Sequence, residues 1–295
     1  MGTLVAMKYP SKLFLEAADH TYVQCGNGGR AWGCWGGKTG GTAFNTGSGS
    51  TRRADAIAGS NERAGVTCYL INGVCHTAAN RILFPAGILV SGARGFALSS
   101  SLFGIYGKTG IKWLPCYAPF NQQAGVTGDL PACAEAAPKT KSKAKAATAK
   151  SQALGKHLQL VRQAYAKLDP EKVSPLDSMQ FQMKLFDQEV RFRLGESVSA
   201  KVATGMRHAK ESVELRHHHM AEAFHNEDMS AAEFVKAFNA MTLKFQNDIA
   251  NAASATQYKK FLELDRDEKV ILALPEGVEA AFGADTAQAV YGSLR

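Results

Sequence analysis

The chain lacks the long apolar run and the leader that would direct it to a membrane or out of the cell. No apolar stretch reaches the roughly 18 to 20 residues that a membrane-spanning helix needs. Residues 1–10 show no basic region followed by an apolar core and a small-residue cleavage site, so a conventional signal peptide is not visible. We therefore expect a soluble protein with no membrane span and a cytoplasmic location, with export by a non-classical route left open.

Cysteine is scarce and confined to the first half of the chain. The uneven spacing of the cysteines favours reduced thiols, and it leaves open a disulfide between Cys25 and Cys34 across a Gly-rich turn. A zinc site would need two closely spaced doublets, which are absent, and segment 92–95 lacks the Gly-Lys-Ser/Thr ending of a phosphate loop. No metal and no cofactor is therefore predicted. The six cysteines are Cys25, Cys34, Cys68, Cys75, Cys116 and Cys133.

What is present divides the chain into three compositional regions. Residues 1–133 are rich in Gly, Trp, Cys and β-branched residues separated by turn signals, which predicts a small domain of strands and helices. Residues 134–150 are basic and of low complexity, as is typical of a solvated linker. Residues 151–295 are poorer in Gly and carry apolar residues at helical spacing, which predicts an α-helical bundle domain. The predicted fold class is α+β.

Three apolar stripes in the last region predict helices that pack against one another. A capping box at Ser230 and Glu233 predicts that the third helix starts directly after Ser230. The second stripe could continue towards Phe224 despite Gly195 and Gly205, which would make a long helix for a globular domain. The stripes are Leu154, Leu158, Val161, Tyr165 and Leu168; Met179, Met183, Phe186, Val190 and Leu194; and Phe234, Phe238, Met241, Phe245 and Ile249.

The chain is basic, with 34 Lys and Arg against 26 Asp and Glu and a formal net charge of +8. The excess lies in residues 1–150. A protein that reads nucleic acid would need a basic stripe on a regular element interleaved with aromatic residues, whereas the lysine run of 134–150 is rich in Ala. We therefore expect no sequence-specific nucleic acid partner and interpret the run as a solubilising tether.

Histidines gather in the helical region. On a helix, Glu214, His218, Glu222 and His225 follow one another at steps of four, four and three residues, so they would share one face. Four residues along one straight helix cannot all converge on a tetrahedral ion, so we expect weak zinc binding at best. The helical region is expected to contribute recognition rather than chemistry.

Cys75 stands where a short helix is predicted to begin. Residues 77–83 place small and aliphatic side chains at helical spacing, Pro85 and Gly87 end the pattern, and Gly73 permits a tight approach before it. A sulfur in the first turn meets backbone N–H groups that lack intrahelical partners and the positive end of the helix dipole. Both favour thiolate over thiol.

Residues 19–26, with the sequence Asp-His-Thr-Tyr-Val-Gln-Cys-Gly, predict a strand that begins on His20, far upstream of the cysteine helix. Together with the Cys-His-Thr-Ala-Ala-Asn of residues 75–80, this order resembles the circularly permuted branch of the papain-like superfamily. That branch includes permuted NlpC-type hydrolases, PPPDE-type peptidases and lecithin retinol acyltransferase relatives. The resemblance covers residues 13–107. It implies a small papain-like α/β domain with a thiolate nucleophile at Cys75, a base at His20 and an acyl-enzyme intermediate.

The remaining members of such a site are left open by the sequence. The group that orients the base could be Gln24, Asp55 or Asn80. The backbone N–H of Cys75 could supply one donor to an oxyanion. His76 follows Cys75 directly and points away from it on a helix, so it is expected to be a surface or substrate-facing residue rather than the base.

These observations lead to two expectations from different classes. The first is a cysteine-dependent hydrolase or acyl transferase that acts on an amide bond in a peptide, an isopeptide or a peptidoglycan stem. The alternative is a non-enzymatic interaction protein whose helical half binds a protein partner. A catalytic Cys75 should be alkylated much faster than the other cysteines, whereas a structural thiol should not.

Overall fold

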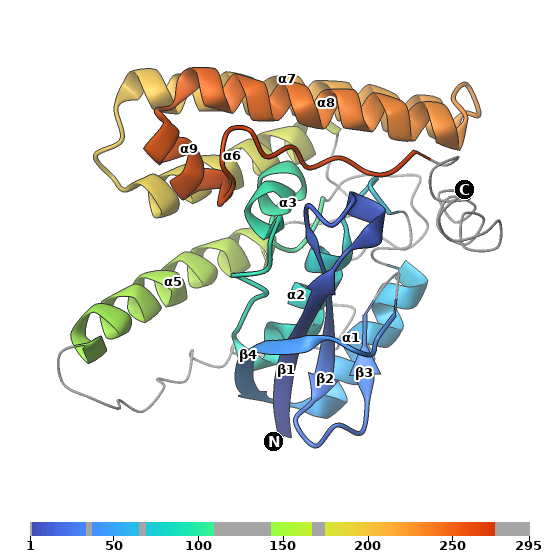
Figure 1. Ribbon diagram of the computed structural model, residues 1–295, viewed down its shortest axis with the longest axis vertical. Coiled ribbons are helices and arrows are strands. Elements are labelled where there is room, and N and C mark those ends of the chain that lie inside the picture. Colours follow the sequence, from blue (N-terminus) through green and yellow to red (C-terminus); the bar gives the residue numbers. More distant parts are fainter. Residues whose placement is uncertain (1, 34–36, 65–68, 109–142, 167–174, 275–295) are drawn as a thin grey trace.

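The computed structural model describes residues 2–33, 37–64, 69–108, 143–166 and 175–274 (Figure 1). Within these residues the chain is α+β, with one antiparallel sheet of four strands and a set of helices. Helices α1 and α2 lie against the sheet, and the long helices α7 and α8 form a layer beyond α3 (Figure 1). The expected α+β class is confirmed.

The sheet is built from β1 (Gly2–Pro10), β2 (Asp19–Cys25), β3 (Ala31–Trp32) and β4 (Thr42–Gly49), in the order β3-β2-β1-β4. The strand predicted to begin on His20 is β2. Strands β1 and β2 are antiparallel and pair without interruption, whereas the pairing of β1 with β4 shifts register between Ala6 and Met7. Leu4, Ala6 and Val23 are fully buried on the face that packs against α1 (Thr51–Ala64) and α2.

Helix α2 (Cys75–Leu83) begins at the cysteine, as the sequence predicts. A short 3-10 helix, η2 (Phe84–Ala86), continues it, and Gly87 then adopts a left-handed conformation with φ of 68° that ends the segment. Glycine tolerates this region at no steric cost. All residues of α2 are buried, so this helix forms the centre of the first part of the fold.

The helical part consists of α5 (Lys143–Ala166), α6 (Pro175–Leu194), α7 (Ala200–His225), α8 (Ala231–Ala252) and α9 (Ala255–Leu262). The three predicted stripes fall on α5, α6 and α8, except that Leu168 lies outside the described residues. The capping box is confirmed, since Ser230 accepts a hydrogen bond from the N–H of Glu233, whose carboxylate accepts one from the N–H of Ser230.

The expected continuation of the second helix towards Phe224 is wrong. Helix α6 ends at Leu194, because Gly195 adopts a φ of 97°, and α7 starts anew after Ser199, whose hydroxyl accepts from the N–H of Val202. Gly205, by contrast, lies inside α7. A Cβ on it would come within 2.8 Å of the Cβ of Ala252, so glycine permits the close crossing of α7 and α8.

The two parts of the chain share their hydrophobic core. Leu70 and Phe103 belong to one cluster with Phe238 and Phe245 of α8, and the Phe103 and Phe238 rings stack at 6.0 Å. Helix α3 (Phe96–Phe103) lies between the sheet layer and the long helices (Figure 1). Helix α5 begins inside the predicted 134–150 linker, and residues 134–142 of that linker lie outside the described residues.

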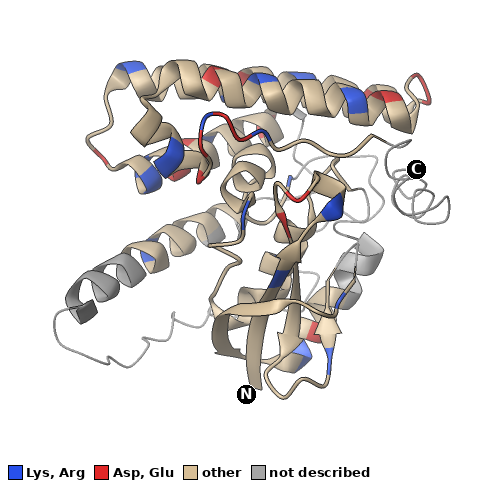
Figure 2. Cartoon of the chain, viewed as in Figure 1, with Lys and Arg blue, Asp and Glu red and all other residues tan. Residues whose placement is uncertain are grey.

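Charged residues are interspersed along the long helices rather than gathered into a field of one sign (Figure 2). Among the described helices, none combines the length and the apolar character that crossing a membrane requires.

Candidate functional site around Cys75

A tight turn directly precedes Cys75. The N–H of Leu70 donates to the carbonyl of Gly73 over 2.9 Å, and Leu70 itself adopts a left-handed φ of 67°. A Cβ on Gly73 would lie 3.0 Å from the side chain of Thr77, so the predicted close approach at this glycine is real. The Thr77 hydroxyl accepts from the N–H of Val74 over 3.3 Å and thereby fixes the first turn of α2.

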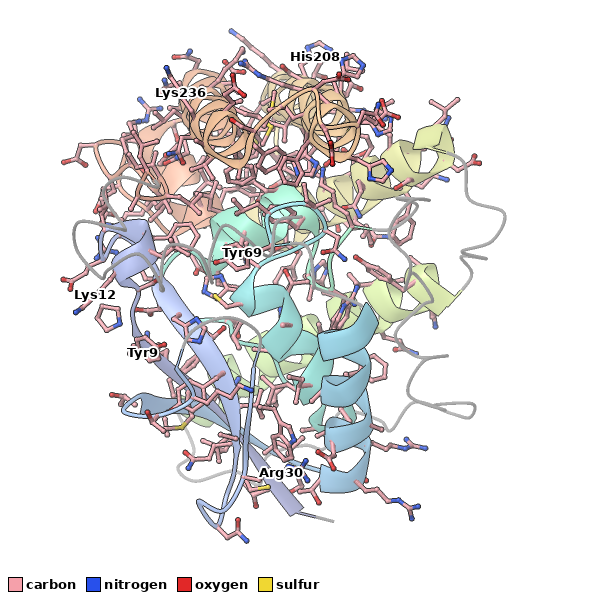
Figure 3. All side chains as sticks on the ribbon, turned by 90° about the vertical axis from the view of Figure 1, so that its right-hand side faces the viewer. Tyr9, Lys12, Arg30, Tyr69, His208 and Lys236 are labelled. Atoms are coloured by element: carbon pink, nitrogen blue, oxygen red, sulfur yellow. The ribbon has the colours of Figure 1, made fainter. Side chains whose placement is uncertain are left out.

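The Cys75 thiol is buried, with 2% of the residue exposed. Burial raises the pKa of Cys75, because the thiolate is the charged form. The nearby backbone N–H groups of Thr21 and His76 and the hydroxyl of Tyr69 oppose this rise in part, whereas the buried Thr21 hydroxyl makes no hydrogen bond. Figure 3 shows Tyr69 at the boundary between α2 and the helical layer above it. The site thus holds donors for a thiolate, but burial keeps the thiol neutral.

His20 lies in β2 beside Thr21. Its ring is 4.9 Å from that of Tyr9, its cross-strand partner, and 6.5 Å from that of Tyr22. Burial lowers the pKa of His20 to about 4, and a hydrogen bond to the carbonyl of Gly37 opposes this only in part. The Nε2 atom is buried without a hydrogen-bond partner. The imidazole is therefore neutral near pH 7, with one nitrogen unused.

The structure brings the thiol together with Thr21 rather than with His20 itself. Side chains alternate along a strand, so Thr21 and Val23 point towards α2, whereas His20 and Tyr22 point to the other face. Burial raises the pKa of Tyr9, which packs against the His20 ring, and a thiolate at Cys75 would add to this rise.

His76 is not at the surface, and that expectation is wrong. It is 4% exposed, and its ring nitrogens lie 2.9 Å from the hydroxyl of Ser99 and 2.9 Å from the carbonyl of Asp19. Because a carbonyl can only accept, Nε2 carries the proton and Nδ1 is left to accept from Ser99. Helix α2 is buried all around, which its short apolar pattern does not reveal. His76 instead ties α2 to the start of β2.

None of the three candidate orienting residues serves His20. Asp55 accepts from Trp32 Nε1 over 3.0 Å and from Arg30. Asn80 bonds to the backbone of residues 90 and 105. The side chain of Gln24 donates to the carbonyl of Gly28 at 3.4 Å.

The group beside the His20 ring is the carbonyl of Gly37, which also accepts from the Tyr9 hydroxyl over 3.0 Å. Every residue carries a carbonyl, so no side-chain pattern in the sequence could have indicated it. Thr21 and Tyr69 were missed for a similar reason, since isolated hydroxyl residues give no motif.

A small cavity of about 30 Å³ adjoins Cys75. No local pattern indicates this cavity, because its walls come from five separate segments of the chain. It is lined by Phe14, Ala18, Leu70, Val74, Cys75, His76, Gly95, Leu98, Ser99, Leu102, Phe103, Phe238, Thr242, Val270 and Leu272.

The histidine-containing face predicted on α7 does not form. Glu214 is buried and binds Lys108 over 2.7 Å and Lys210, whereas His218 and Glu222 form an exposed pair at 3.2 Å. Glu214 turns inward because α7 packs on the first part of the fold, where two lysines need a counter-charge. In the part of the chain that the structure describes, no three His, Cys, Asp or Glu side chains form a group suited to a metal ion.

Of the six cysteines, the structure describes two, and both Cys25 and Cys75 are free thiols. The open pairing of Cys25 with Cys34 lies outside the described residues, as do Cys68, Cys116 and Cys133. Comparison with family models, with curated proteins and with solved structures gave no match. The arrangement around Cys75 is therefore the observation from which a function is inferred.

Proposed function

We propose that this chain is a cysteine-dependent hydrolase or acyl transferase of the permuted papain-like kind, acting on an amide bond of a peptide, an isopeptide or a peptidoglycan stem. The observation that carries the proposal is the position of Cys75 as the first residue of α2, beside a cavity and near the backbone N–H groups of Thr21 and His76. The first turn of a helix favours the thiolate, which is the nucleophilic form.

In the proposed reaction the Cys75 thiolate attacks the amide carbonyl, and a C–S bond forms as the carbonyl π electrons move to oxygen. The backbone N–H of Cys75, at the helix start, donates to this oxyanion. The C–N bond then breaks, and the leaving amine takes the proton that His20 removed from the thiol. Water, or a second nucleophile in a transferase, breaks the C–S bond and restores the thiol.

The arrangement described above is a resting one. Burial raises the pKa of Cys75 and lowers that of His20, so both groups are neutral and no thiolate–imidazolium pair forms. Catalysis requires β2 to rearrange so that the His20 side chain, whose Nε2 is unpartnered, moves from the opposite face of the strand to the sulfur. Access of water or substrate would remove the burial that separates the two pKa values.

The two-part organisation belongs to the same proposal. Residues 1–133 would form the papain-like domain, with the 134–150 linker and the 151–295 helical domain following. The shared core of Phe103 and Phe238 supports a helical part that acts as a permanent wall of the site rather than as a separate module.

A non-enzymatic interaction protein is the competing proposal, and one observation favours it. The thiol is 2% exposed and its pKa is raised, as for a structural cysteine. The helical part also carries leucines that are more than half exposed, at Leu160, Leu176 and Leu215, which would suit a protein partner.

Activity assays with matched variants decide between the two. Wild-type protein would be incubated with a library of peptidyl aminomethylcoumarin amides and with purified peptidoglycan, and released coumarin or amine would be measured. Cys75→Ala and His20→Ala should abolish turnover, while Cys25→Ala and the exposed His219→Ala should retain it. Turnover in the Cys75→Ala variant would show that Cys75 is not the nucleophile. Loss of turnover in Cys75→Ala but not in His20→Ala would show that His20 is not the base.

A further inference from the structure

The cavity beside Cys75 is lined mainly by apolar side chains. Its volume of about 30 Å³ leaves space beside Leu98, Leu102, Val270 and Leu272, whose side chains offer water no hydrogen bonds. Apolar cavities of this kind stay dry and accept apolar ligands. Because Cys75 lines the same cavity, any group attached to its sulfur would have this space as its nearest apolar surroundings.

One polar atom at the cavity lacks a partner. Thr242 of α8 lines the cavity and is 3% exposed, and its hydroxyl oxygen makes no hydrogen bond. A buried hydroxyl without a partner destabilises the folded state, because it has lost its hydrogen bonds to water. The two other polar side chains in the lining, His76 and Ser99, bind each other. The Thr242 hydroxyl is thus available to a ligand that enters the cavity.

One wall of the cavity is an extended segment, residues 264–274, which we call the strap. It runs in red below α8 and past α3 (Figure 1). Asn239 and Gln246 of α8 each bind its backbone twice, through both N–H and C=O, at Leu272 over 2.9 and 2.8 Å and at Val270 over 3.4 and 3.3 Å. These side-chain contacts hold Val270 and Leu272 in the cavity wall.

The strap is joined to the first part of the fold by few bonds. The N–H of Ala273 donates to the carbonyl of Leu13 over 2.8 Å, and Glu268 pairs with Arg94 at 2.6 Å in a half-exposed ion pair. Half-exposed pairs contribute little stability. The strap is thus fixed mainly by α8 and by the burial of Leu264, Val270 and Leu272 in the shared core.

We propose that this cavity, enlarged when the strap moves, is the subsite for the acyl half of the substrate. The geometry selects an acyl group that is aliphatic or aromatic next to the carbonyl, with at most one hydrogen-bonding atom for Thr242, and it excludes charged acyl groups. This inference rests on the proposed nucleophile, but it concerns only which chemical groups fit beside the sulfur of Cys75.

Alkyl methanethiosulfonates test the subsite without requiring catalysis. The Cys75 thiolate attacks the sulfenyl sulfur of the reagent and displaces methanesulfinate, so that one S–S bond forms as another breaks and Cys75 carries the alkylthio group as a mixed disulfide. Modification rates at Cys75 and Cys25 would be measured by peptide mass spectrometry, with Cys25 correcting for intrinsic reagent reactivity. Normalised rates should rise from methyl to butyl and benzyl reagents, by up to about fourfold for each methylene buried. Equal or faster reaction of sulfonatoethyl and trimethylammonioethyl reagents would overturn the proposal.

Two substitutions in the strap provide the matched comparison. Leu272→Ala enlarges the cavity and should raise the benzyl-to-methyl rate ratio at Cys75, while Leu274→Ala, at an exposed position of the same segment, should leave that ratio unchanged. If Leu272→Ala accelerates all reagents equally, the strap merely shields the thiol and the subsite is refuted. If Cys75 reacts faster with apolar reagents but the protein hydrolyses no amide, the cavity is an apolar subsite and the proposed hydrolase or transferase activity is wrong.

Discussion

Thr21 of β2 lies beside Cys75 of α2, and its buried hydroxyl makes no hydrogen bond. The residue that follows the predicted base thus touches the predicted nucleophile, although the base itself points to the opposite face of the strand. Strand β2 and helix α2 are therefore the two elements on which any chemistry at this site depends.

Removing the Tyr69 hydroxyl should make Cys75 less reactive. Tyr69→Phe keeps the ring but deletes one donor to the thiolate, so alkylation by iodoacetamide near pH 7 should slow by about tenfold, as expected for a hydrogen bond to a charged group. Thr21→Val is the matched control, because the Thr21 hydroxyl makes no hydrogen bond, and it should leave the rate unchanged. An unchanged rate in Tyr69→Phe would show that this hydroxyl does not stabilise the thiolate.

The protein should lose stability as pH falls from about 6.5 towards 4. Burial lowers the pKa of His20 and His76 to about 4 and that of His217 to about 3, so the unfolded state binds protons in this window that the folded state does not. At pH 5, each of these histidines should lower the free energy of unfolding by roughly 2 kcal/mol relative to its value at pH 7. The check is urea unfolding at both pH values.

A variant assigns this pH dependence to particular residues. His217→Gln should reduce the difference in unfolding free energy between the two pH values, whereas the exposed His219→Gln should not. Glu189 and Glu214 affect stability in a separate pH range. Their pKa values are lowered to about 2 in the folded protein, so their contribution to the free energy of unfolding is lost only below about pH 4.5.

Breaking the buried ion cluster of α7 should be costly. Glu214 neutralises Lys108 and Lys210, and the Nζ atom of Lys210 also donates to the carbonyl of Leu102 over 3.0 Å. Glu214→Gln should lower the free energy of unfolding by about 3 kcal/mol or more, because two buried lysines lose their counter-charge. Glu222→Gln, in the exposed pair with His218, should change it by less than about 1 kcal/mol. Equal effects would contradict the inward placement of Glu214.

Removing the unpartnered hydroxyl of Thr242 should stabilise the protein. Thr242→Val replaces a buried oxygen that makes no hydrogen bond with a methyl group of similar size, so thermal unfolding should report a gain of about 1 kcal/mol. A loss of stability would show that the hydroxyl has a partner in solution, such as a bound water.

The two parts of the chain should not fold independently. Fragments 1–133 and 134–295 would each expose half of the cluster that joins Leu70 and Phe103 to α8, so they should aggregate alone and co-purify when co-expressed. Phe103→Ala should weaken their association, whereas Leu15→Ala, at an exposed position, should not. Two monomeric fragments with cooperative unfolding would contradict the shared core.

Local patterns predicted local structure well. The start of α2 at Cys75, its end near Gly87 and the capping box of α8 each depend on residues within one or two turns of one another, so spacing alone was informative. The break at Gly195 was the exception. Glycine in a helical pattern can be tolerated, as at Gly205, or can adopt a left-handed conformation that ends the helix, and the neighbours in space decide which occurs.

The amino-acid sequence by itself determined that Cys75 opens a helix, that His20 lies in a strand and that the second half is helical, because these properties follow from side-chain spacing along the chain. Only the tertiary structure decided which groups meet. The alternation of β2 placed Thr21 and not His20 against the thiol, the packing of α7 turned Glu214 inward, and the strap brought Val270 and Leu272 to Cys75. Such contacts join residues far apart in the sequence, and they are set by the burial of the shared core rather than by any local pattern.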